Sequence, residues 1–192
     1  YGSVQIRNVA TLAGNIATAS PIGDSLPLLL SLDASISIES FNKKMIIPLN
    51  DFFTGYRKTK LKKGYFISSI KIPIFKKNIF KAYKISKRID DDISSVCASF
   101  NLAIVNKKIK DIKIAFGGMA ATPKRAVYCE KILLNSNFSE DLILKAQKSL
   151  EKDFQPIDDM RASKDYRMEI AKNLLTKCFA EIKKNKLIRL NY

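Results

Sequence analysis

The sequence predicts an α+β protein in which an antiparallel sheet packs against helices. Apolar and polar residues alternate in stretches such as 96–105 and 109–116, and this period of two is typical of strands. From residue 139 onward the apolar spacing changes to the three- and four-residue steps of a helix. With 192 residues, 46% of them hydrophobic, the chain can bury the core of one or two domains.

Small and hydroxyl-bearing residues dominate the stretch from Gln5 to Asp24, QIRNVATLAGNIATASPIGD. Gly14 has no Cβ, so it can adopt a positive φ or let a phosphate approach the backbone. Short polar groups close to that backbone come from Thr11, Asn15, Thr18 and Ser20. The stretch therefore suits a diphosphate, and a plain Gly/Ser turn between strands explains the residue types equally well.

A short helix is predicted from Ser25 to Leu32, with Pro27 in its first turn, where the missing N–H does no harm. Asp24 would lie at the start of this helix as its N-cap, as a ligand of the cofactor, or as both. The apolar run in this helix is far shorter than the roughly 18 to 20 residues of a membrane span, so no membrane insertion is expected.

Further elements complete the first part of the chain. Residues 35–40 alternate with a period of two and can pair with residues 45–47 across a polar turn, which predicts a β-hairpin. Residues 51–59 are predicted as a short helical turn that ends in a basic loop, and residues 65–73 as a strand. Ile67 lies within that strand, where it can serve as an ordinary core residue.

The second part begins with a strand predicted at 80–88. Its alternation places Lys81 on one face with Tyr83 and Ile85, and Lys84 on the other face. A lysine on a polar face is usually just solvated.

Residues 96–105 and 109–116 are predicted to form a second hairpin, and the glycine pair Gly117 and Gly118 a turn. The acidic triplet at 90–92 is interpreted as a charged turn that pairs with nearby cations, in preference to an acid–base or metal site.

Two helices are predicted toward the end of the chain. Ser139 can cap the first, and Ser163 or Asp165 begins the second. Their apolar stripes, which would pack in the core, are Leu142, Ile143, Ala146 and Leu150 in the first helix, and Tyr166, Ile170, Leu174 and Cys178 beside Ala171, Leu175 and Phe179 in the second.

Metal ligands and catalytic groups are not evident. Cys97, Cys129 and Cys178 are far apart and the chain has no histidine, so there is no zinc or iron–sulfur pattern. The thiols are expected to be small buried hydrophobes in a reducing cytoplasm. No nucleophile and base are placed together, so the residues alone do not indicate acid–base or covalent catalysis.

The net charge of +16 raises nucleic acid as a partner. Residues 1–40 carry one basic residue, Arg7, and the excess is scattered over the rest of the chain, where lysine outnumbers arginine. Arginine is the better fork for phosphates and base edges, so a solvated, lysine-rich surface explains the charge better than nucleic-acid binding.

Several segments resemble one family. The stretch at 5–24 resembles the second flavin-contacting segment of the FAD-binding subunit or domain of xanthine dehydrogenase and its molybdenum hydroxylase relatives, with Ala13-Gly14-Asn15 where the family usually has Gly-Gly-Asn. The segments 51–59, 83–93, 117–126 and 154–167 are similar to further segments of these flavoproteins. The resemblance covers the chain from Gln5 to about Glu181.

This resemblance implies a fold and a set of flavin ligands. Residues 1–75 would form the second half of an FAD-binding domain of the vanillyl-alcohol-oxidase (PCMH-like) type, and residues 79–192 a C-terminal domain like that of the CO dehydrogenase flavoprotein. An upstream glycine-rich flavin segment of the family is absent, so the chain is expected to be truncated and inactive alone. The implied FAD contacts are Tyr1, Thr11, Leu12, Ala13, Gly14, Asn15, Thr18, Ser20, Asp24, Ile67 and Lys84.

The resemblance also implies an electron-transfer role. A partner with molybdopterin would hydroxylate a purine, [2Fe-2S] clusters would pass the electrons to FAD, and NAD would accept them. These partners are domains or subunits of the same complex, so a cytoplasmic hetero-oligomer is expected. Xanthine is favoured by the matches at 83–93 and 156–167, while other purines, aromatic aldehydes and carbon monoxide stay open. The alternative function is a basic binding or scaffolding module with a decayed flavin site.

Overall fold

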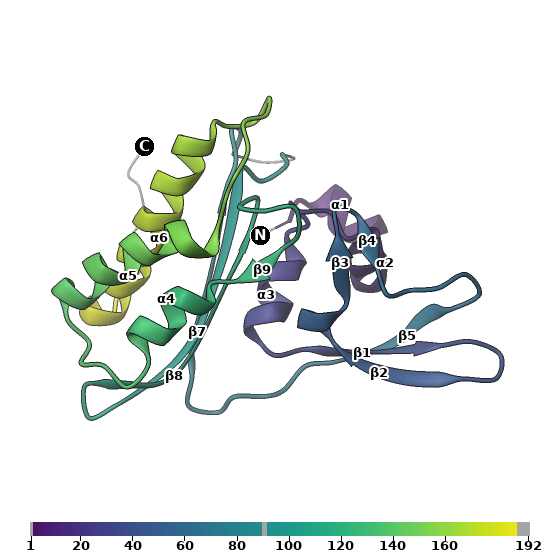
Figure 1. The fold of residues 1–192 in the computed structure, drawn as a ribbon, viewed down its shortest axis with the longest axis horizontal. Coiled ribbons are helices and arrows are strands. Elements are labelled where there is room, and N and C mark those ends of the chain that lie inside the picture. Colours follow the sequence, from purple (N-terminus) through teal and green to yellow (C-terminus); the bar gives the residue numbers. More distant parts are fainter. Residues whose placement is uncertain (1, 90–91, 188–192) are drawn as a thin grey trace.

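The computed structural model describes residues 2–89 and 92–187, and its fold is α+β (Figure 1). The helices are α1 (Val4–Val9), α2 (Leu12–Thr18), α3 (Ser25–Ser31), the 3₁₀ helix η1 (Leu49–Asp51), α4 (Val127–Leu133), α5 (Glu140–Asp153) and α6 (Lys164–Lys184). The strands are β1 (Ser35–Glu39), β2 (Lys44–Pro48), β3 (Phe53–Gly55), β4 (Lys58–Thr59), β5 (Phe66–Lys71), β6 (Ile79–Ile85), β7 (Val96–Val105), β8 (Lys108–Gly117) and β9 (Lys124–Arg125).

The strands form three antiparallel sheets, in the orders β2-β1-β5, β3-β4 and β6-β7-β8-β9. The hairpins predicted at 35–47 and 96–116 are confirmed, as are the strands at 65–73 and 80–88. In Figure 1 the first sheet and the β3–β4 hairpin lie on one side of the molecule, and the four-stranded sheet lies on the other.

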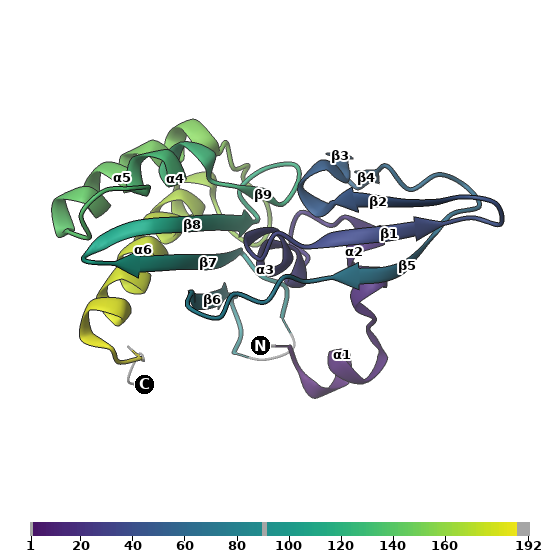
Figure 2. The same ribbon diagram turned by 90° about the horizontal axis from the view of Figure 1, so that it is seen from below.

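Strand β7 is buried on both of its faces, because helices cover both sides of the sheet (Figure 2). Its alternation places Ala98 and Phe100 toward α4, α5 and α6. The alternate positions face α3, where the Ser99 hydroxyl lies 2.6 Å from that of Ser31, and the Asn101 amide donates to the Ser31 carbonyl at 3.0 Å. Each of these buried polar groups therefore has a partner, as stability requires.

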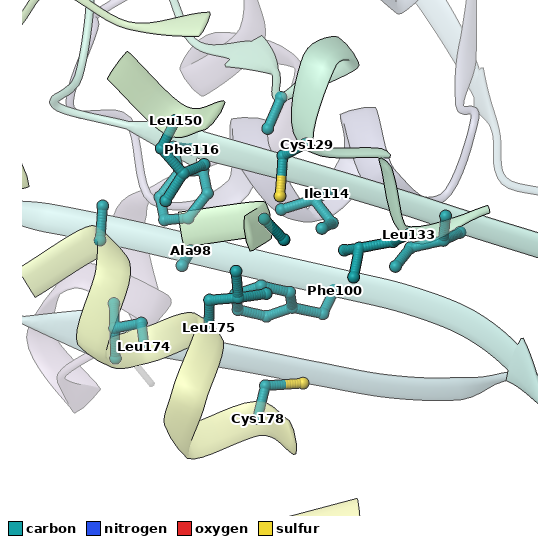
Figure 3. Close-up of a cluster of buried hydrophobic side chains, with 14 of the residues drawn as sticks. Ala98, Phe100, Ile114, Phe116, Cys129, Leu133, Leu150, Leu174, Leu175 and Cys178 are labelled. Atoms are coloured by element: carbon teal, nitrogen blue, oxygen red, sulfur yellow. The ribbon is translucent and has the colours of Figure 1, made fainter. Parts of the chain in front are cut away.

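The larger core lies between the four-stranded sheet and its helices (Figure 3). Phe100 makes edge contacts with Tyr83 and Phe116, each at 5.9 Å between ring centroids. Leu174, Leu175 and Cys178 of α6 cover these rings, as the predicted stripe requires. Tyr166, at the start of the same stripe, is exposed instead.

The second core belongs to the first sheet and α3, with Leu26, Ile36, Ile38 and Phe52 among its buried residues. Ala115 of β8 is also part of it. The second half of the chain therefore contributes β8 to the core of the first half.

Helix caps agree with the sequence better than some element types do. Ser139 accepts from the Leu142 N–H at 3.3 Å and Ser163 from the Tyr166 N–H at 3.2 Å, which confirms both predicted helix starts. The helical turn predicted at 51–59 is wrong beyond Asp51, because β3 and β4 pair there as a hairpin. The turn of this hairpin uses Arg57 at a φ of +51°. Helix α4 was not predicted.

All three cysteines are buried, and none lies in a disulfide. Burial raises the pKa of Cys178 to about 12, and burial likewise raises the pKa of Cys129. Because the thiolate is the reactive form, we expect Cys129 and Cys178 in the native protein at pH 8 to react with iodoacetamide at least about 100-fold more slowly than in protein unfolded in urea. Rapid labelling of a native cysteine, located by mass spectrometry, would contradict the burial of the three thiols.

Candidate cofactor site

The stretch at 5–24 folds mainly as two short helices, α1 and α2. The interpretation of this stretch as a plain Gly/Ser turn between strands is therefore wrong. Ser3 caps α1 through the Ile6 N–H at 3.3 Å, and Thr11 caps α2 through the Gly14 N–H at 3.0 Å. Each hydroxyl satisfies one N–H of a first helical turn, which has no partner within its own helix.

Gly14 lies inside α2 and does not have a positive φ, so the first of the two roles suggested for it does not apply. Its lack of a side chain has another structural cause. A Cβ at this position would lie 2.7 Å from the Thr11 Oγ1 atom that caps the helix. Gly14 therefore leaves room for the cap, and a close phosphate approach at this residue stays a prediction.

Helix α2 has one exposed face with small side chains. Ile16 is buried and packs in the core of the first half, whereas Thr11, Leu12, Gly14 and Thr18 are exposed. Ala13 is half-buried. The Thr18 hydroxyl donates to the Gly14 carbonyl at 2.8 Å, so its oxygen can still accept from an outside donor.

The turn between α2 and α3 is fixed at several points. The Ser20 hydroxyl accepts from the Ile22 N–H at 3.4 Å, and the Asn15 side chain accepts from the Ser25 hydroxyl. The Pro21 carbonyl accepts from the Gly118 N–H at 2.8 Å, which joins this turn to the end of β8.

Asp24 does not cap α3 with its side chain, so that part of its prediction is wrong. Its backbone is already helical, at φ −64° and ψ −31°, whereas a capping residue is typically extended. The carboxylate instead lies 2.7 Å from the Lys84 Nζ atom and accepts from the Ser94 hydroxyl. Asp24 thus joins the first half of the chain to β6 and to the segment before β7.

Lys84 and Lys81 lie on opposite faces of β6, as the alternation predicts. Lys84 pairs with Asp24, whereas Lys81 lies 3.2 Å from a carboxylate oxygen of the buried Glu181. The Tyr83 hydroxyl donates to the same carboxylate at 2.9 Å, and burial, followed by nearby acidic groups, raises the pKa of Tyr83. Lys84 is therefore held by a partner and is not simply solvated.

The remaining predicted contacts do not join this group. Ile67 pairs across the sheet with Ile38 and packs against the core of the first half. Tyr1 lies outside the described residues, as do residues 90 and 91 of the acidic triplet. Asp92 accepts from the Arg88 backbone N–H at 2.9 Å, which lowers the pKa of Asp92 and fits the predicted charged turn.

Sequence reasoning missed Ser94, Gly118 and Arg167 as supports of this site. Ser94 contacts Asp24, Gly118 contacts Pro21, and Arg167 donates to the carbonyls of Ser95 and Gly118. The residue types carry no local signal for these contacts, apart from the match of 154–167 to a family segment.

Within residues 2–89 and 92–187, no group of three or more potential ligands from His, Cys, Asp and Glu could hold a metal ion. The helices of the described chain are also too short or too polar to cross a membrane.

Residues 81–182 match the family model of the CO dehydrogenase flavoprotein C-terminal domain, which covers more than half of the chain. The chain belongs to the flavoprotein family of the molybdenum hydroxylases. Residues 1–75 of this flavoprotein match a second model, described as the FAD binding domain in molybdopterin dehydrogenase.

Known relatives agree with this assignment. The chain is 40% identical over 150 residues to a nicotinate hydroxylase and 39% identical over 158 residues to a xanthine dehydrogenase, both of Emericella nidulans. It covers 11% and 12% of those proteins. A glyceraldehyde dehydrogenase medium chain of Sulfolobus acidocaldarius is 33% identical over 185 residues, which are 94% of this chain and 64% of the relative.

The fold agrees with solved structures as well. Carbon monoxide dehydrogenase of Hydrogenophaga pseudoflava aligns with a TM-score of 0.86 at 24% identity, over 91% of this chain and 61% of that chain. This confirms the predicted two-part α+β architecture.

Proposed function

We propose that this flavoprotein binds FAD along α2, the α2–α3 turn and Lys84, and that it relays electrons within a molybdenum hydroxylase. The observation that carries the proposal is the Asp24–Lys84 pair at 2.7 Å. It joins the segment matched as an FAD-binding domain to the segment matched as the flavoprotein C-terminal domain. The two halves thus meet where the sequence predicts flavin contacts.

The residues present fit such a cofactor. The exposed face of α2 carries glycine and hydroxyl groups, so a phosphate can approach without meeting a large side chain. Leu12 adds an exposed apolar side chain, and Lys84 a cation that is about one fifth exposed. Bound FAD would supply the two-electron chemistry, and the protein would orient it and set its electrostatic surroundings. Asn15, Ser20 and Asp24 would position the turn beneath it.

The complete assembly is proposed as follows. Partner domains or subunits hold molybdopterin and [2Fe-2S] clusters. Xanthine is the favoured substrate and NAD the electron acceptor, and the assembly is placed in the cytoplasm. Relatives of similar identity carry the names of nicotinate, xanthine and glyceraldehyde enzymes, so the substrate choice depends on the local matches at 83–93 and 156–167. Within this flavoprotein chain, residues 1–75 and residues 79–192 are proposed as two domains.

An absorption spectrum tests the cofactor assignment, with Lys84→Ala as the decisive variant. We expect the complete natural protein to be yellow and Lys84→Ala to keep FAD with a reduction potential lowered by about 30 mV, which corresponds to about 1.4 kcal/mol. Removing the ammonium leaves the Asp24 carboxylate without the Lys84 charge, so the reduced, more negative cofactor becomes less favourable and the potential falls.

Lys81→Ala is the matched control, since it removes a cation from the opposite face of the same strand. Its potential should equal that of the unmodified protein. A colourless protein that takes up no added FAD would favour a basic scaffolding module instead. A potential that shifts in Lys81→Ala and not in Lys84→Ala would contradict the role of Lys84.

A further inference from the structure

Arg167 in the first turn of α6 is almost completely buried, with 2% of its side chain exposed. Its Nη1 atom donates to the carbonyls of Ser95 and Gly118, and its Nη2 atom lies 2.6 Å from Asp159 Oδ1. Among the described residues its Nε atom has no hydrogen-bond partner. Such a buried cation costs free energy to desolvate, so stability alone is a weak reason for its presence.

The two carbonyls that Arg167 binds belong to the supports of the candidate site. Ser95 follows Ser94, whose hydroxyl donates to the Asp24 carboxylate. Gly118 donates its N–H to the Pro21 carbonyl at 2.8 Å, and Pro21 lies in the turn that leads to Asp24. The planar guanidinium of Arg167 therefore holds the backbone at both places, beside Ser94 and at Gly118, where the Asp24 segment is bonded to the rest of the chain.

Asp159 extends the same support to its own loop, residues 154–163, which connects α5 to α6. Burial opposes its ionisation, but the backbone N–H groups of Arg161 and Ala162 and the Arg167 guanidinium more than compensate, so the pKa of Asp159 is lowered. In the same loop, the Arg161 carbonyl accepts a hydrogen bond from the Ser95 hydroxyl. The Met160 carbonyl accepts a second hydrogen bond, from the Lys87 ammonium at 2.8 Å.

We propose that Arg167 and Asp159 form a clamp that positions Asp24 beside Lys84 and so determines how tightly the site holds its cofactor. The proposal rests on the proposed function for the identity of that cofactor, FAD. Both residues act through Ser95 and Gly118, so they are positioning residues. The clamp needs the forked guanidinium, because the single ammonium group of a lysine cannot reproduce its geometry.

The test compares Asp159→Asn with Arg161→Gln in the complete natural protein. Asp159→Asn keeps the side-chain shape and removes the charge that holds Arg167. Arg161→Gln removes the other cation on the same carboxylate, which lies 3.3 Å away and is 29% exposed. We expect the FAD dissociation constant to rise about tenfold in Asp159→Asn and less than about twofold in Arg161→Gln. Arg167→Lys should resemble Asp159→Asn, which provides a second variant if the first does not fold.

A double-mutant cycle separates positioning from general stability. In an Asp24→Ala background, Asp159→Asn should change the dissociation constant less than about twofold, because the positioned carboxylate is gone. The same tenfold effect in both backgrounds would overturn the proposal.

Amide exchange gives a readout without FAD. Because the clamp holds Gly118, the exchange rate of its N–H should rise about tenfold in Asp159→Asn. In Arg161→Gln this rate should stay unchanged. If the unmodified protein binds no FAD, the proposed function fails and this readout alone decides the clamp. Unchanged exchange in Asp159→Asn would overturn it.

Discussion

Gly118→Ala is expected to lower the free energy of unfolding by about 3–5 kcal/mol, among the largest effects of a single methyl group in this chain. Gly118 has a φ of +83°, which a side chain disfavours. An added Cβ would also lie 2.4 Å from the Ser95 carbonyl oxygen and 3.0 Å from Arg167 Nη1. The backbone oxygen cannot move without disturbing β7, so the strain and the clash add.

Gly64→Ala is the matched control, because Gly64 has a φ of +82° and no atom within 4 Å of an added Cβ. It should cost only about 1–2 kcal/mol, from the backbone conformation alone. Urea denaturation of both variants gives the comparison, and the difference between them measures the clash. Equal losses would show that Ser95 and Arg167 can move away freely, so that they do not hold the Asp24 segment rigidly.

Gly14→Val is expected to weaken FAD binding at least about 100-fold, or about 2.8 kcal/mol, while the second half of the chain stays folded. The new side chain would lie on the exposed face of α2, where the cofactor is proposed to approach. It would also displace the Thr11 hydroxyl, which lies 2.7 Å from an added Cβ. Equilibrium titration with FAD measures the effect, and circular dichroism checks the fold.

Thr11→Val removes the Thr11 hydroxyl, which is both the cap and a predicted FAD contact, without adding volume at residue 14. Losing an N-cap typically costs about 1 kcal/mol, so this variant should weaken FAD binding about fivefold. If Gly14→Val binds FAD as tightly as the unmodified protein, the exposed face of α2 is not the cofactor surface. If the two variants bind FAD equally weakly, displacement of the Thr11 hydroxyl accounts for the effect of Gly14→Val.

Local patterns predicted most of the second half correctly. The alternation of β6 placed Lys81 and Lys84 on opposite faces, and hydroxyl residues at 139 and 163 marked two helix starts. These features depend on neighbours within a few positions, so a single sequence contains them.

The candidate site was harder to predict, because its contacts join distant parts of the chain. Asp24 and Lys84 are 60 positions apart, and Ser95 and Arg167 are 72 apart. Helices α1 and α2 were also missed, since each is at most seven residues long and small residues obscure the periodicity. Ser3 and Thr11, each three residues before the N–H it caps, were the available signal.

The packing of α3 against β7 and β8 has a consequence for how such chains can be recombined. The family models divide the sequence after residue 75, but α3 and Ala115 belong to one core across that division. A chimera joined there would pack α3 against the sheet of another protein. That sheet would need small residues at the positions of Ser99 and Ala115 and an amide side chain at the position of Asn101. The boundary between the two family models and the boundary between the two packed cores therefore lie at different places in the chain. We expect exchange of these segments between relatives to succeed only where both relatives carry the same residues at the contact of α3 with β7 and β8.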